Sequence, residues 1–148
     1  MKTEIVASLK SIETENYLDR VFYRPIGFKI AKALIGTGIT PNMITILSLF
    51  VGSVAGVLWY FPYSLPFALV GILSLIVANI LDCVDGQLAR LTGIKSEIGR
   101  ILDGFAGDFW FLLIYIAFAH RLNVQFDTWL FWLAALLMAL SHLNQAAI

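Results

Sequence analysis

Residues 81–90 read LDCVDGQLAR and place two carboxylates at the end of a long apolar run. Asp82 and Asp85 lie in this stretch, and Asp103 and Asp108 follow in the next apolar segment. Carboxylates inside such segments are energetically costly and usually functional. They cannot all stay charged in a low-dielectric environment unless cations neutralise them. Because oxygen ligands select hard ions such as Mg²⁺, Mn²⁺ or Ca²⁺, the pattern predicts a divalent-cation site.

The residue types around the aspartates narrow the chemistry. Two metal ions held by shared carboxylates are a common device for phosphoryl transfer, and Arg90 could clamp a phosphate. Zinc is disfavoured because the single cysteine and the two histidines are far apart in the sequence. An EF-hand is excluded because it needs aspartates at alternating positions of one loop. The structural alternative is a polar seam, in which the aspartates pair with Arg90, Lys95 and Arg100.

Helical geometry adds small residues to the acidic ones. At about 100° per residue, one face of the first helix carries two acids and two small residues: Asp82, Asp85, Gly86 and Ala89. On the next helix, Gly99 and Asp103 share a face. Small side chains allow a bulky ligand or a neighbouring backbone to approach closely.

Composition identifies the class of protein that must position these residues. The chain has 148 residues, of which 59% are hydrophobic, and its mean hydropathy is +0.84. Soluble domains have roughly 45–50% apolar residues, so this is a membrane protein. The formal net charge is zero, which does not point to nucleic acid, and the single cysteine, Cys83, excludes an internal disulfide.

The expected elements run from a polar tail to a series of spans. Residues 1–16 read as a polar tail, and residues 17–38 as an amphipathic helix with a basic face, which favours the membrane interface. Pro25 should bend or divide this helix, and Thr40 with Pro41 should begin the next one. Four apolar helices long enough to cross about 30 Å of hydrocarbon should follow: residues 43–61, 65–81 (helical to about 91), 96–119 and 128–147.

The basic residues predict the orientation of these spans. Arg24, Lys29 and Lys32 precede the first span, and Arg90, Lys95 and Arg100 surround the second connection. Two crossings separate the groups, so both lie on one side, which the positive-inside rule makes cytoplasmic. The site should therefore face the cytoplasm. The chain ends in an apolar run without polar anchors, so we expect it to be a truncated part of a longer protein.

The segment DCVDGQLARLTGIKSEIGRILDGFAGD closely resembles the signature of the CDP-alcohol phosphotransferases (CDP-alcohol phosphatidyltransferases). That signature is D-x2-D-G-x2-A-R, a spacer of about eight or nine residues, and G-x3-D-x3-D. The segment ITPNMIT is also similar to the family, more weakly. The matching positions are Asp82, Asp85, Gly86, Ala89, Arg90, Gly99 and Asp103.

The resemblance implies a fold and an activity. The expected fold is all-α: an interfacial helix and a six-helix membrane bundle, of which residues 39–148 would form four helices of a catalytic domain, C-terminally truncated. Full-length members commonly form homodimers. The implied reaction transfers a substituted phosphate from a CDP-linked alcohol, with CDP-diacylglycerol as the preferred donor, to an acceptor alcohol with release of CMP. It belongs to phospholipid biosynthesis in the cell membrane.

The resemblance also implies roles for individual residues. A pair of divalent cations, Mg²⁺ or Mn²⁺, would be held by Asp82, Asp85, Asp103 and Asp108. The CDP group would contact Asp82, Asp85, Gly86, Ala89, Arg90 and Gly99. Lys95 and Arg100 are weaker candidates for binding a substrate phosphate.

The last position of the signature departs from the family. An aspartate that serves as base and metal ligand should stand at position 107, but the chain has Gly107 and then Asp108. On a regular helix Asp108 points about 100° away from that position. A π-bulge or a glycine-assisted distortion around Gly104 or Gly107 could return Asp108 to the site as a displaced base beside Asp103. Alternatively the metal site has fewer ligands and another base, or activity is lost.

Three other functions remain open at this point. One is transfer from CDP-choline or CDP-ethanolamine to a lipid alcohol. Another is a Mg²⁺-dependent membrane prenyltransferase, whose aspartate-rich motifs lack the G-x2-A-R continuation. The third is an inactive membrane scaffold, supported only by Gly107.

Overall fold

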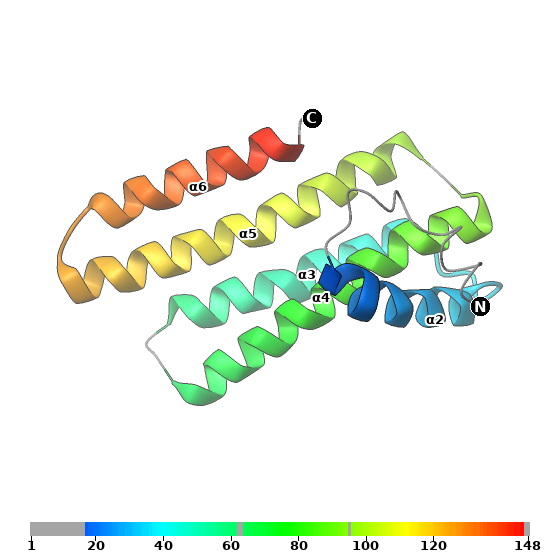
Figure 1. The fold of residues 1–148 in the computed structure, drawn as a ribbon, viewed down its shortest axis with the longest axis horizontal. Coiled ribbons are helices and arrows are strands. Elements are labelled where there is room, and N and C mark those ends of the chain that lie inside the picture. Colours follow the sequence, from blue (N-terminus) through cyan, green and yellow to red (C-terminus); the bar gives the residue numbers. More distant parts are fainter. Residues whose placement is uncertain (1–16, 62–63, 95, 147–148) are drawn as a thin grey trace. The chain divides into compact units, whose positions relative to one another are not determined.

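A computed structural model describes residues 17–61, 64–94 and 96–146, with side chains described as far as His142. The predicted tail over residues 1–16 lies outside the described residues. The described chain is helical without strands, as expected for an all-α membrane protein. In order, it forms η1 (Asp19–Tyr23), α2 (Arg24–Leu34), α3 (Pro41–Tyr60), α4 (Leu65–Thr92), α5 (Glu97–Phe126) and α6 (Leu130–Ala146) (Figure 1).

The predicted amphipathic helix over residues 17–38 is shorter than expected. It contains the π-helical η1, and α2 begins at Arg24, one residue before Pro25. Tyr23 and Arg24 both have right-handed helical angles, so the helix changes type there without a break. The helix ends at Leu34 because Ile35 is extended and Gly36 and Gly38 have positive φ angles of 81° and 83°. Glycine adopts such angles without the steric cost that other residues pay.

The membrane helices largely match the predicted segments. Thr40 and Pro41 begin α3 as predicted, and the Met43 N–H donates to Thr40 Oγ1 at 3.4 Å. By length and composition, three helices in the described part can cross a membrane: α3, α4 and α5. The predicted fourth span is α6, whose 17 residues make it shorter than these three.

Helix α5 extends seven residues beyond its predicted end at residue 119. The predicted connection over residues 120–127 contains neither glycine nor proline, so nothing in it stops the helix. The helix ends at Phe126, where Asp127 takes a positive φ of 47°. Aspartate tolerates this left-handed conformation better than most residues.

The chain divides into two compact units. The first unit contains Met1–Ser48 and Ala78–Asp103, and the second contains Leu49–Val77 and Gly104–Ile148. The core of the first unit is Ala31, Ile44, Val84 and Leu88, from α2, α3 and α4. In the second unit α3 and α5 pack closely at glycines: a Cβ on Gly52 would overlap the Trp110 indole, and one on Gly56 would lie 2.5 Å from Leu113 Cβ.

Candidate functional site

The first unit holds the aspartates of the expected signature on a helical hairpin. Asp82 and Asp85 lie near the end of α4, and Asp103 lies in the second turn of α5. The connection is short because Gly93 turns with a φ of 73° and Ser96 caps α5, accepting the Gly99 N–H at 2.9 Å. The hairpin therefore brings together carboxylates that are about twenty residues apart.

The side chains of these aspartates interact. Asp82 and Asp103 are within side-chain hydrogen-bonding reach, and Asp103 also acts electrostatically on Asp85. Arg24, from α2, brings a positive charge to Asp82. Asp85 is 4% exposed, and its Oδ2 accepts a 2.7 Å hydrogen bond from Thr45 Oγ1 of α3. The first unit thus gathers negative charge in a partly buried place.

The small residues of the signature lie beside polar groups. A Cβ on Gly86 would lie 3.3 Å from Arg90 Nη2, so the guanidinium folds back over this glycine. A Cβ on Gly99 would lie 2.5 Å from Asn42 Oδ1. Ala89, in the same turn of α4 as Gly86, is partly exposed. The sequence predicted that a ligand or a neighbouring backbone approaches these small residues closely. At Gly86 and Gly99, polar side-chain atoms occupy the space where a Cβ would lie.

Two contacts of the site were not predicted from the sequence. Asn42 and Thr45 belong to the ITPNMIT segment, yet no role was assigned to either. They lie three residues apart on one face of α3 and reach Gly99 and Asp85. The available signal was their polarity at the start of an apolar helix, on the same predicted membrane side as the aspartates.

Helix α2 is also tied to the signature. Gln87 is fully buried, and its Nε2 donates to the Arg24 carbonyl oxygen at 3.1 Å. Gly27 permits this approach, since a Cβ there would lie 3.0 Å from Gln87 Oε1 and 3.1 Å from Cys83 Cβ. A side chain inside the signature therefore holds α2 against α4.

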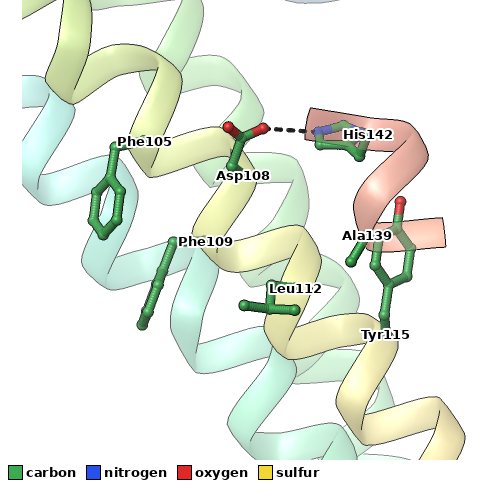
Figure 2. A pocket seen from close by; sticks show the side chains of 7 residues that line it. All are labelled: Phe105, Asp108, Phe109, Leu112, Tyr115, Ala139 and His142. Atoms are coloured by element: carbon green, nitrogen blue, oxygen red, sulfur yellow. Dashed lines mark ion pairs between the residues drawn. The ribbon is translucent and has the colours of Figure 1, made fainter. Parts of the chain in front are cut away.

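Asp108 belongs to the second unit and has a partner of its own. Its Oδ1 lies 3.5 Å from His142 Nε2 of α6 (Figure 2). Helix α5 is α-helical from Glu97 to Phe126, so the expectation of a π-bulge near Gly104 or Gly107 is wrong. The displaced-base role of Asp108 loses this mechanism and stays a prediction.

The two weaker phosphate candidates gain no support. Lys95 lies outside the described residues, and Arg100 is exposed in the first turn of α5.

Nowhere in residues 17–61, 64–94 and 96–142 do three histidine, cysteine, aspartate or glutamate side chains converge closely enough to hold one metal ion. The chemistry of the donor set still fits a hard cation, because Asp82, Asp85 and Asp103 offer only oxygen and act electrostatically on one another.

The chain is similar to known proteins over a region that includes the α4–α5 hairpin. Residues 38–147 match the CDP-alcohol phosphatidyltransferase family. A phosphatidylinositol phosphate synthase of Mycobacterium tuberculosis (strain ATCC 25618 / H37Rv) is 31% identical over 110 residues, covering 68% of this chain and 49% of that protein. An archaetidylinositol phosphate synthase of Pyrococcus horikoshii is 40% identical over 75 residues, covering 51% of this chain and 38% of that protein. The chain spans about half the length of the mycobacterial relative and less of the archaeal one.

Proposed function

Because the chain belongs to the CDP-alcohol phosphatidyltransferase family, we propose that it transfers a substituted phosphate from a CDP-linked alcohol to an acceptor alcohol. The preferred donor is CDP-diacylglycerol, and CMP is released. The acceptor oxygen forms a bond to the phosphorus beside the lipid alcohol, and the bond from that phosphorus to the CMP oxygen breaks. The hydroxyl proton passes to a base on the protein.

The observation that carries this proposal is the α4–α5 hairpin of the first unit. It places Asp82 and Asp103 within side-chain hydrogen-bonding reach, adds the buried Asp85, and sets Gly86 against the Arg90 guanidinium. A diphosphate needs positive charge and close backbone approach, and these residues supply both when a cation is bound.

We assign roles on this basis. Asp82, Asp85 and Asp103 would hold one or two Mg²⁺ or Mn²⁺ ions, which neutralise charge on the diphosphate and the departing CMP. Gly86, Ala89, Arg90 and Gly99 would border the CDP group. Thr45 orients the Asp85 carboxylate through its hydrogen bond.

Asp108 stays the proposed proton acceptor for the attacking hydroxyl, and in the absence of a bulge in α5 the proposal rests on its access to a ligand. It is partly exposed beside a cavity, so a ligand hydroxyl can reach it. His142 lies beside the Asp108 carboxylate and can position it.

The protein is an integral membrane protein with α3, α4 and α5 as candidate spans. We further propose that the hairpin faces the cytoplasm, because Arg90 and Arg100 flank the α4–α5 connection and the α3–α4 connection has no basic residue. Assembly as a homodimer is a further proposal, resting on the family alone.

A CMP-release assay tests the function. The full-length protein in lipid nanodiscs is given CDP-diacylglycerol and Mg²⁺, with myo-inositol 1-phosphate, glycerol 3-phosphate, serine or dioctanoylglycerol as acceptor. We expect acceptor-dependent CMP release that Asp82→Asn abolishes and Glu97→Gln retains, because Glu97 is an exposed carboxylate in the spacer and occupies no fixed position of the signature. If no donor and acceptor pair yields CMP, the catalytic proposal falls and a non-enzymatic role takes its place.

A further inference from the structure

A cavity of about 170 Å³ lies beside the Asp108–His142 pair and is built by the second unit alone. Figure 2 shows its lining residues, which come from α5 and α6: Phe105, Asp108, Phe109, Leu112, Tyr115, Ala139 and His142. Pockets that enclose a drug-sized ligand have roughly 300–1,000 Å³. This cavity therefore accommodates one end of a larger molecule.

The polar pair offers a hydrogen-bond acceptor and a hydrogen-bond donor at a suitable separation. Asp108 Oδ1 and His142 Nε2 lie 3.5 Å apart, beyond the usual range of a direct N–H···O bond. An oxygen atom about 2.8 Å from each would complete two good bonds. A hydroxyl group fits this position because it donates through its proton and accepts through its lone pairs. The carboxylate is 23% exposed and the imidazole 31% exposed, so a ligand can reach both.

The remaining walls restrict what else the ligand carries. Phe105, Phe109 and Leu112 are apolar, and the Tyr115 hydroxyl is the one further polar side-chain group in the lining. The imidazole is backed by Phe111 at 4.7 Å between ring centroids. A sugar phosphate would lose water from several hydroxyls that these walls cannot replace. Burial of an aliphatic chain against these walls would instead be favourable, because apolar surface is removed from water and the crevice is filled. The lining therefore favours a single hydroxyl attached to an apolar body.

We propose that this cavity binds an amphipathic alcohol through its hydroxyl, which donates to Asp108 and accepts from the Nε2–H of His142. The inference rests on the proposed function only in taking this alcohol to be the acceptor. Binding itself requires neither the CDP donor nor the cation. It gives His142 a ligand-contacting role and separates this chain from relatives whose names specify an inositol phosphate product.

Photolabelling of the whole chain in lipid nanodiscs tests the inference without relying on catalysis. The probe is a hexadecanol that carries a diazirine near its hydroxyl end, and the control is its methyl ether. We expect the alcohol to label peptides of α5 and α6 around the cavity about fivefold more than the ether, since the ether cannot donate to Asp108. Excess 1-decanol should remove the labelling, and excess decane should not.

The two histidines of the chain provide matched variants. His142→Phe should bring alcohol labelling down to the level of the ether, and His142→Gln, which keeps an N–H donor, should restore part of it. His120→Phe should retain full labelling, because His120 stacks on Tyr60 and does not line this cavity.

Three outcomes would overturn the inference, and none depends on folding of a variant. Equal labelling of wild type by alcohol and ether would show an apolar crevice without hydroxyl recognition. Displacement by myo-inositol 1-phosphate and not by 1-decanol would identify a polar acceptor site. Labelling elsewhere in the chain would show that the cavity holds only water or lipid tails. If CMP release fails while hydroxyl-dependent labelling persists, the proposed function falls and the binding site remains.

Discussion

Asp85 is the most enclosed carboxylate of the signature, and its surroundings explain how it is tolerated. It is 4% exposed, and the hydroxyl of Thr45, itself 2% exposed, donates to it at 2.7 Å. Burying a charge without hydrogen bonds is far more costly than burying it with them. A residue forty positions earlier in the chain therefore determines whether this carboxylate can stay in place.

We predict that Thr45→Val destabilises the protein by about 1–3 kcal/mol, because it removes a hydrogen bond to a buried carboxylate at nearly constant volume. Thr45→Ser keeps the hydroxyl and should lose much less. Chemical unfolding in detergent micelles, followed by tryptophan fluorescence, measures the difference. Equal stability of the valine variant and the wild type would show that Asp85 does not depend on this bond.

Asp108 is the residue that we propose to accept the proton of the attacking hydroxyl. We predict that Asp108→Asn lowers acceptor-dependent CMP release by roughly 10²- to 10⁴-fold, since an amide cannot take the hydroxyl proton. Initial rates at saturating donor measure the effect. Binding of a CDP-lipid should be little changed, which separates a lost base from a lost fold. Full activity of the asparagine variant would remove Asp108 from the reaction.

At the scale of elements, close helix packing depends on glycines that the sequence alone did not single out. Gly52 of α3 leaves room for the Trp110 indole of α5, and Trp110 is 2% exposed. We predict that Gly52→Ala costs about 1–3 kcal/mol, because the new Cβ would overlap that indole and force the pair apart. Thermal unfolding in micelles is the measurement.

Gly104 of α5 supplies the control for this prediction. A Cβ there meets nothing within 4 Å, so Gly104→Ala should be neutral or stabilise the helix by up to about 1 kcal/mol. Gly52→Ala should thus lower the stability of the protein, whereas Gly104→Ala in the same unit should leave it unchanged or raise it. Destabilisation by both would mean that helix flexibility, and not the space beside Trp110, is what the glycines provide.

The hydrogen bond from Gln87 of α4 to the backbone of α2 is a second contact that positions one helix against another. We predict that Gln87→Met releases α2, because it keeps the length of the side chain but removes the N–H that donates to the Arg24 carbonyl. Amide hydrogen exchange should become faster in Arg24–Leu34 and stay unchanged in α6. Unchanged exchange in α2 would show that the apolar contacts of Phe28 and Ala31 suffice to hold it.

Features set by neighbouring residues could be predicted from the sequence, whereas contacts between distant residues could not. The spans and the hairpin of Asp82, Asp85 and Asp103 follow from periodicity, helix-start signals and a short connection, all of which are local. The contacts of Thr45 with Asp85 and of His142 with Asp108 join residues 40 and 34 positions apart, and no local pattern records them. The π-bulge expectation was wrong because it came from the register of the family signature, whereas α5 stays α-helical through Gly104 and Gly107.

At the scale of the whole molecule, orientation in the membrane decides which water-filled compartment the hairpin meets. The connections after α3, α4 and α5 must alternate between the two sides if each of these helices crosses the bilayer. Arg90 and Arg100 flank the second connection, and basic residues are retained on the cytoplasmic side. The α4–α5 connection should therefore be cytoplasmic, and Asp127, after α5, should face the other side.

Single cysteines in a Cys83→Ser background test this alternation. Ile94 and Asp127 are both exposed in connections, so Ile94→Cys and Asp127→Cys are comparable probes. In intact cells, a membrane-impermeant maleimide should label Asp127→Cys and leave Ile94→Cys unlabelled, and inverted vesicles should reverse the pattern. Labelling of both from the same side would mean that α5 does not cross the bilayer. Labelling of Ile94→Cys alone in intact cells would place the signature outside the cytoplasm, away from the cytoplasmic supply of a CDP-linked donor, and would count against the proposed reaction as well as the orientation.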